Sequence, residues 1–319
     1  MSPPRVSVAM VAYDHEAFLA QAIESVLVQA YGDWELVIGE DHSTDRTLAI
    51  AQRFEREHPD RIRVLRDERN LGRRRNYVRT LRACRGELVA QLDGDDFWTS
   101  PGKLSTQVAF LDAHPDCAWC FHATQELRQA PKRSTHNLYP PGRRERYELE
   151  DLLWANFVGS ASVLWRRPNA EQLPAWFWEV PVGDWPMHVL CAQRGWFGYI
   201  DEVMCAHRIH GRGAFVGMPE VAQVRQRLEI RRYLGAHLGE SVADTVAAAD
   251  LRDRFRLAKA FRREGQVGAA LRELGWCFSH RNQGQRPRLP RLGAEWLRVV
   301  LRGLVPPARW GVGEEAGSP

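Results

Sequence analysis

The sequence lacks the features of a secreted or membrane-spanning protein. Its six cysteines are too scattered among 319 residues for the disulfide framework of a small secreted domain, so reduced thiols are expected. The first apolar run, residues 6–12, is too short for a signal peptide. No stretch reaches the ~20 apolar residues that a membrane helix needs. We therefore expect a soluble, cytoplasmic protein.

The chain also has little net charge and no convincing zinc site. Lys and Arg number 44 against 40 Asp and Glu, a net charge of +4, which is too small to indicate nucleic-acid binding. Cys117 and Cys120 have the spacing of half a zinc site. They lie in a strand-like run, where side chains three positions apart point to opposite faces, and no second pair follows at zinc spacing. Neither nucleic acid nor zinc is therefore an expected partner.

Strand-like apolar runs alternate with amphipathic helical segments over roughly the first 115 residues. The expected helices cover about residues 17–29, 44–57, 72–84 and 101–114. This alternation predicts an α/β fold, Rossmann-like, with a mostly parallel sheet flanked by helices. The expected strands are Val6–Ala12, Trp34–Gly39, Ile62–Leu65 and Leu88–Leu92.

Two domains are expected from the pattern along the chain. Residues 1–217 form the α/β domain, with a nucleotide-binding half at 1–115 and an acceptor half at 116–217 that contains a polar loop at 131–146. Residues 218–319 are expected to form a helical C-terminal extension. Within it, a basic amphipathic segment from about Leu289 to Arg309 either packs on the domain or contacts the inner face of a membrane that holds a lipid-linked acceptor.

Polar side chains follow three of the expected strands. Ligands of such sheets bind beyond the carboxyl ends of the strands, so these side chains should share one crevice. The sharpest feature is Asp93-Gly94-Asp95-Asp96, where hard oxygen ligands suit Mg²⁺ or Mn²⁺ bridging to a diphosphate and Gly94 permits a tight turn. The alternative is an ordinary acidic turn.

The second and third strands are followed by further polar positions. Asp41 can accept hydrogen bonds from a nucleobase or ribose, while Ser43 and Asp45 are interpreted as helix caps. Arg75 and Asn76 open the next helix and can hold phosphate or sugar, although a solvated basic face is the alternative.

Four motifs in this order resemble the family-2 glycosyltransferases of the GT-A fold, of the bacterial polysaccharide or glycoconjugate type. They are Val6–Tyr13, Glu40–Asp45, Asn70–Asn76 and Leu92–Asp96. The resemblance covers roughly the first 215 residues and implies a nucleotide-diphospho-sugar donor, a divalent metal and inversion at the anomeric carbon.

The resemblance also implies individual roles. The position of Asp41 contacts the base, that of Asp93 the ribose or diphosphate, and that of Asp95 the metal. Val11 and Tyr13 would line the nucleotide site, together with Gly94, Arg75 and Asn76. The sequence departs from the family pattern at two positions. Glu40 stands where Asp is commoner, and Val11 stands where a small polar residue or Pro is commoner, so the identity of the donor's nucleobase is left undetermined.

Two later segments complete the resemblance. Asp184 opens an expected helix and would be the general base that takes the proton of the acceptor hydroxyl; the alternative is a helix cap. Trp185 beside it would stack on an acceptor sugar. His210, in an Arg-x-His-Gly stretch, would add a metal ligand.

The sequence thus predicts a metal-dependent inverting glycosyltransferase acting on a glycan or other hydroxyl acceptor. A nucleotidyltransferase is the first alternative, but it would favour a Gly-rich, Lys-bearing loop after the first strand, and residues 12–16 offer none. The second alternative is a non-catalytic module that binds polyanions through its basic surface.

Overall fold

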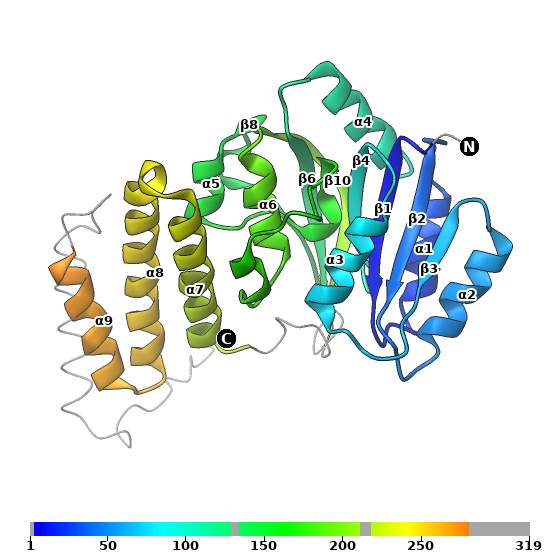
Figure 1. Ribbon diagram of the computed structural model, residues 1–319. Helices are drawn as coiled ribbons and strands as arrows, with labels where there is room; N and C mark the ends of the chain where they lie inside the picture. The colour runs from blue at the N-terminus through cyan, green and yellow to red at the C-terminus, as the bar shows by residue number, and fades with distance from the viewer. Residues whose placement is uncertain (1–2, 129–133, 211–217, 281–319) are drawn as a thin grey trace, which may run out of the picture. The chain divides into compact units, whose positions relative to one another are not determined.

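The apolar runs of the first half form neighbouring strands of one sheet (Figure 1). The computed structural model describes residues 3–128, 134–210 and 218–280. Within these residues β3, β2, β1 and β4 lie side by side in that order and are parallel. Their bounds are β1 Val6–Ala12, β2 Trp34–Glu40, β3 Ile62–Leu65 and β4 Leu88–Asp93.

The sheet continues beyond β4 with mixed strands. The antiparallel strand β9 (Leu164–Arg166) joins β4 to β6 (Trp119–Arg128), and β10 (Phe197–Ile209) runs parallel to β6. The two-residue strand β5 (Phe97–Trp98) then pairs with β10 and brings the acidic turn against that strand.

The expected polar loop at 131–146 is only partly a loop. It contains β7 (Ser134–Leu138), which pairs with β6, and η1 (Pro141–Arg143), and it ends in β8 (Arg146–Tyr147), which pairs with β10. Every residue of β7 is exposed, so this strand has no alternation of apolar and polar residues to reveal it.

Helices cover both faces of the sheet. On one face α1 (Leu19–Leu27), α2 (Thr47–Glu57) and α4 (Lys103–Ala113) pack in a single core with alternate residues of β1, β2 and β4. On the other, α3 (Arg73–Ala83) lies in front of the sheet (Figure 1). It comes so close that a Cβ on Gly39 would lie 1.9 Å from Thr80 Oγ1.

The remaining elements of this unit come between β8 and β10 in the sequence. They are α5 (Leu149–Trp154), η2 (Ser160–Ser162), η3 (Ala175–Trp178) and α6 (Asp184–Ala192). Gly183, just before α6, packs against Tyr77 of α3, where a Cβ would lie 3.3 Å from the ring. The start of α6 is thereby placed beside α3.

The chain divides into two compact units, Met1–Val216 and Gly217–Pro319. In the second unit, α7 (Glu220–Leu238), α8 (Ala243–Arg263) and α9 (Val267–Ser279) share an apolar core, and η4 (Glu240–Val242) connects α7 to α8. The buried Arg231 of α7 pairs with Asp250 and Asp253 of α8, at 2.7 Å each.

The basic segment near Leu289–Arg309 lies outside the described residues. None of the helices described has the length and apolar character required to span a bilayer.

Candidate active site

A cleft of about 770 Å³ opens at the carboxyl ends of β1, β2 and β4. Its lining includes seven of the residues that the sequence singled out: Val11, Tyr13, Asp41, Asn76, Asp93, Asp95 and Asp184. The ends of the parallel strands bring five of these residues together, α3 contributes Asn76, and α6 adds Asp184 from the other half of the unit. Nucleotide-side and acceptor-side candidates therefore share one space.

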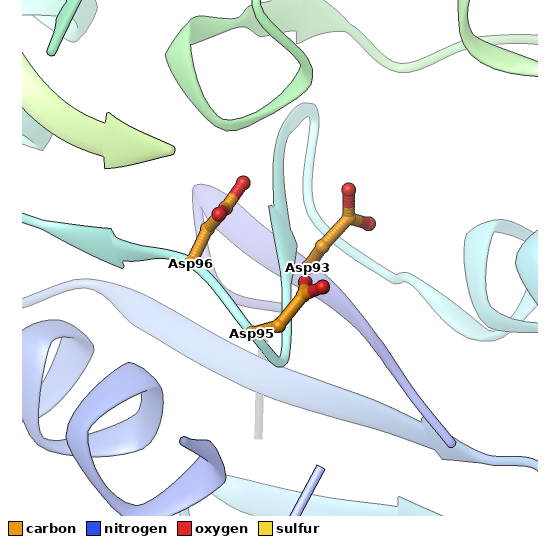
Figure 2. Close-up of side chains that lie close together, drawn as sticks. All are labelled: Asp93, Asp95 and Asp96. Carbon is orange, nitrogen blue, oxygen red and sulfur yellow. The ribbon is translucent and has the colours of Figure 1, made fainter. Parts of the chain in front are cut away.

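The acidic turn after β4 groups three carboxylates. Asp93, Asp95 and Asp96 each place a carboxylate oxygen within 4.8 Å of the others, and Figure 2 shows the three groups on one side of the turn. Like charges this close repel one another, and a divalent cation would relieve the repulsion. Carboxylates are also the ligands that Mg²⁺ and Mn²⁺ prefer, so the donor set fits such an ion.

The three carboxylates are held differently. Asp96 is 1% exposed and accepts hydrogen bonds from the Arg208 backbone N–H (2.8 Å) and from His207 Nδ1 (3.0 Å). Burial by itself would lower the pKa of His207, but the hydrogen bond and the charge of Asp96 outweigh it and raise that pKa to about 9. Asp96 therefore ties the turn to β10.

Asp93 and Asp95 face the cleft more openly. Asp93 accepts a hydrogen bond from Ser160 Oγ at 3.1 Å, and burial, together with the charges of Asp95 and Asp96, raises its pKa. The Asp95 carboxylate lies 3.1 Å from His210 Nε2 and 3.7 Å from His15 Nε2. The structure thus brings the two expected metal ligands, Asp95 and His210, together.

Gly94 serves close packing rather than an unusual backbone conformation. It is not among the glycines with positive φ. A Cβ at this position would lie 2.9 Å from His15 Nδ1 and 3.2 Å from the Ala12 Cβ. The Gly94 N–H donates to the Val11 carbonyl at 2.8 Å. A larger residue would push the turn away from β1.

Asp41 lies at the end of the cleft next to β2. Its carboxylate is buried and accepts the Leu71 N–H at 2.7 Å, and burial raises its pKa. The neighbouring Glu40 accepts the backbone N–H groups of Ser43 (2.8 Å) and His42 (3.2 Å). The longer Glu side chain spans this turn, which gives a physical reason for Glu at position 40.

The loops after β1 and β2 are tied to each other. Ser43 Oγ accepts the Asp14 N–H at 3.1 Å, and the Asp14 carboxylate accepts the Thr44 N–H at 2.8 Å. The interpretation of Ser43 as a helix cap is therefore wrong, since α2 begins at Thr47. Asp45 does accept the Thr47 N–H, at 2.8 Å. These bonds hold Tyr13, which is 43% exposed, at the mouth of the cleft.

The start of α3 differs from expectation in one residue. Arg75 is exposed and does not line the cleft, whereas Arg73 and Arg74 do. Asn76 is buried and donates to the Gly39 carbonyl at 2.6 Å while accepting a hydrogen bond from Arg79 at 2.7 Å. Asn76 therefore fixes α3 on β2 at the edge of the cleft.

Asp184 is the first residue of α6, and the N-cap position belongs to Gly183, which has no side chain to cap the helix. Within the described part of the chain its carboxylate has no hydrogen-bond partner. Its charge nevertheless reaches the neighbouring groups: burial first, and then Asp184, raise the pKa of Tyr77 well above its ordinary value. Capping therefore does not account for this carboxylate.

Trp185 does not line the cleft. It is 2% exposed and donates its indole N–H to the Leu152 carbonyl at 3.0 Å. The hypothesis that it stacks on an acceptor sugar must be corrected, because its ring faces the core between α5 and α6.

His15 and Ser160 are among the cleft residues that were missed in the sequence. His15 follows β1 and could have been found by the same strand-end rule that selected Tyr13. Ser160, the partner of Asp93, comes from η2, 67 positions away, and no local pattern marks it.

Comparison with known proteins gives a consistent result. Residues 7–173, more than half of the chain, match the family model described as Glycosyl transferase family 2. An uncharacterised protein of Mycobacterium tuberculosis is 32% identical over 211 residues, which cover 65% of this chain and 60% of that protein. The chain thus spans about 60% of the length of these mycobacterial relatives.

Solved structures share the fold. S. aureus TarS, residues 1–349 in complex with UDP-GlcNAc, has a TM-score of 0.64 at 16% identity, covering 92% of this chain and 89% of that one. The mannosyltransferase PcManGT from Pyrobaculum calidifontis, in complex with GDP-Man and Mn²⁺, has a TM-score of 0.59 at 17% identity, covering 95% and 88%. The family resemblance and the GT-A fold predicted from the motifs are confirmed.

Proposed function

Since the chain belongs to glycosyl transferase family 2, we propose that it transfers a sugar from a nucleotide-diphospho-sugar to an acceptor hydroxyl with inversion at the anomeric carbon. The observation that carries the proposal is the joint position of Asp184 and the Asp93–Asp96 turn in one cleft. The carboxylates of the turn would then bind the donor, and the carboxylate of Asp184 would take the proton. Residues 1–217 would form the catalytic domain, and 218–319 a helical extension.

Asp184 is proposed as the general base. A base must accept a proton from the attacking hydroxyl, so its carboxylate has to be open to substrate. The Asp184 carboxylate lines the cleft and makes no hydrogen bond to any described residue. The attacking oxygen would approach from the side of α6, and an in-line displacement would require the diphosphate to depart on the opposite side.

The acidic turn is proposed to hold the diphosphate through a divalent cation. Asp95 and His210 would be its protein ligands, with Asp93 supporting the ribose or diphosphate. When bound, Mn²⁺ or Mg²⁺ would stabilise the negative charge that develops on the leaving diphosphate. Asp41 would meet the base, and Val11, Tyr13, Arg73 and Arg74 would flank the nucleotide.

Support for a nucleotide-sugar donor comes from similar structures. TarS carries UDP-GlcNAc and PcManGT carries GDP-Man with Mn²⁺. The cleft here lies at the strand ends where such donors bind in α/β sheets. We therefore expect a UDP- or GDP-sugar as donor.

A donor panel tests the proposal directly. UDP-, GDP- and dTDP-sugars would be compared by thermal shift of the full chain, with and without Mn²⁺. Binding to the folded state raises the melting temperature, and the rise should be larger when the metal is present. A chain that no nucleotide-sugar stabilises, with or without Mn²⁺, would contradict the proposal. Pyrophosphate release from a nucleoside triphosphate would instead favour a nucleotidyltransferase.

A further inference from the structure

A second groove, of about 780 Å³, lies beside the cleft. We name it the arginine groove, because five arginines of α3 line it together with Trp178 of η3; they are Arg73, Arg74, Arg75, Arg79 and Arg82. Arg73 and Arg74 line both the groove and the cleft. A ligand in the groove would therefore continue directly into the place where transfer is proposed.

The charge of this groove is only partly neutralised. Arg79 pairs with Asp67 at 3.6 Å, and Arg82 with Glu171 at 3.4 Å. Arg73 and Arg75 have no ion pair within the described residues, and no acidic residue stands in the first turn of α3. The cationic groups at the cleft end of the groove thus lack acidic partners in the described part of the chain.

Arg74 is partly buried next to the like charge of Arg73, which disfavours its charged form. Its guanidinium donates to the Trp178 backbone carbonyl, and its Nε is buried without a hydrogen-bond partner in the part of the chain that the structure describes. Burial first, and then the neighbouring charge of Arg73, lower the pKa of Arg74. Adjacent cations that are partly desolvated destabilise one another unless an anion is bound between them.

Trp178 adds a second kind of contact. Its side chain is 38% exposed, which is a large fraction for a bulky apolar residue. An exposed indole face packs well on the apolar face of a sugar ring, while guanidinium groups pair with carboxylates and phosphates. The combination fits a chain of sugars that carries negative charges.

We propose that the arginine groove binds the anionic groups of the acceptor, which is a glycan bearing carboxylate or phosphate groups. The inference rests on the proposed function, because it takes the adjoining cleft to be the place of transfer. The acceptor chain lies along α3, its acidic groups meet Arg75 and the neighbouring arginines, and Trp178 contacts a ring. Its terminal hydroxyl then reaches the cleft at Arg73 and Arg74.

Binding of charged probes to the full chain tests this assignment. The probes are fluorescent oligogalacturonate and phosphorylated dextran oligomers, with neutral dextran of the same length for comparison, measured by anisotropy at two salt concentrations. At least one acidic probe should bind, more weakly at high salt, and neutral dextran should bind far less. If no acidic probe binds better than neutral dextran, the proposal is overturned.

Substitutions then locate the binding. Arg75→Gln should weaken binding of the acidic probe about two- to fivefold, the range for one exposed ion pair, and combining it with Trp178→Ala should weaken it further. The matched control is Arg56→Gln, which removes an exposed arginine from the last turn of α2 and should leave the affinity unchanged. Equal affinities in Arg75→Gln and Arg56→Gln would overturn the proposal.

Two further measurements separate this inference from the proposed function and from a membrane role. Thermal stabilisation by nucleotide-sugars should be the same in Arg75→Gln and the parent, since Arg75 lies outside the cleft; a loss would reassign Arg75 to the donor. If the chain binds a nucleotide-sugar donor but no acidic glycan, this inference is overturned while the proposed function is not. Binding to phosphatidylglycerol vesicles that depends on Arg75, without binding to acidic glycans, would overturn it in favour of a lipid surface.

Discussion

Asp96 and Asp184 are both carboxylates of the same cleft, but the protein holds them in opposite ways. Asp96 is almost fully buried and receives hydrogen bonds from His207 and from the Arg208 backbone. Asp184 opens α6 and receives none from the described residues. A carboxylate whose lone pairs are already occupied contributes to folding, whereas one that is open to the cleft is available to a substrate.

The largest effect is expected for Asp184→Asn. The amide cannot take a proton, so the transfer rate should fall by roughly 10²–10⁴-fold, the usual contribution of a general base. Donor binding and the melting temperature should stay close to those of the parent, because the native carboxylate makes no hydrogen bond that the described structure depends on. The rate would be measured by donor turnover with acceptor present.

A matched control for Asp184→Asn is Glu150→Gln. Glu150 is an exposed acidic residue in the first turn of α5 and does not line the cleft. It removes one negative charge from a helix start and should leave the transfer rate unchanged. Full activity in the Asp184 variant would remove that residue as the base and would break the contrast with Asp96.

Asp95→Asn should act on the metal rather than on the proton. Replacing a charged ligand by a neutral one should weaken Mn²⁺ binding in the presence of nucleotide by at least about 10-fold, as even changes outside the ligand shell do. Calorimetric titration of Mn²⁺ into the nucleotide-bound protein measures this without relying on activity. Unchanged Mn²⁺ affinity would mean that Asp95 is not a ligand.

Asp96→Ala should act mainly on stability. It would leave the buried Arg208 N–H without its partner and remove the charge-assisted bond from His207, costing about 2–3 kcal/mol of unfolding free energy. Urea denaturation measures the cost. A variant as stable as the parent would show that Asp96 is not a folding residue, and the comparison with Asp184 would lose its basis.

The strand ends were the predictable part of this molecule. The first four strands match their predicted bounds to within one residue, because each is a short apolar run ended by turn residues. Residues that follow parallel strands meet at one edge of the sheet whatever the helices do. This is why Tyr13, Asp41 and Asp95 were brought together correctly.

Helix faces were the less predictable part. Successive residues on a helix are rotated by about 100°, so a motif that places a residue on a helix does not decide where it points. Arg75 lies outside the cleft while Arg73 and Arg74 line it, and Trp185 enters the core while Asp184 faces the cleft. Ser160 depends on tertiary structure alone, since it meets Asp93 from a distant turn.

His188 limits the rule drawn from Asp184, because its side chain also makes no hydrogen bond to a described residue and yet lies outside the cleft. It is fully buried on α6 and stacks on Trp119 with ring centroids 5.3 Å apart, and neither ring nitrogen has a hydrogen-bond partner among the described residues. An unpartnered group away from substrate should matter for packing only. We therefore expect His188→Phe to retain the transfer rate and to change the response of stability to acid.

The sign of that response follows from the pKa of His188. Burial lowers this pKa to about 4, against an ordinary value of 6.5, although the charge of Asp184 opposes the shift. Between these values the unfolded chain binds a proton that the folded chain does not, so stability falls as pH falls from 6.5 towards 4 and is unaffected above 6.5.

His188→Phe should reduce this loss of unfolding free energy by up to about 1.4 kcal/mol per pH unit, as measured by urea titrations at several pH values. Some loss should remain, because burial also lowers the pKa of His122 to about 3. An unchanged acid profile would contradict the role of His188 in this loss of stability, and a lost transfer rate at neutral pH would show that His188 does more than pack in the core.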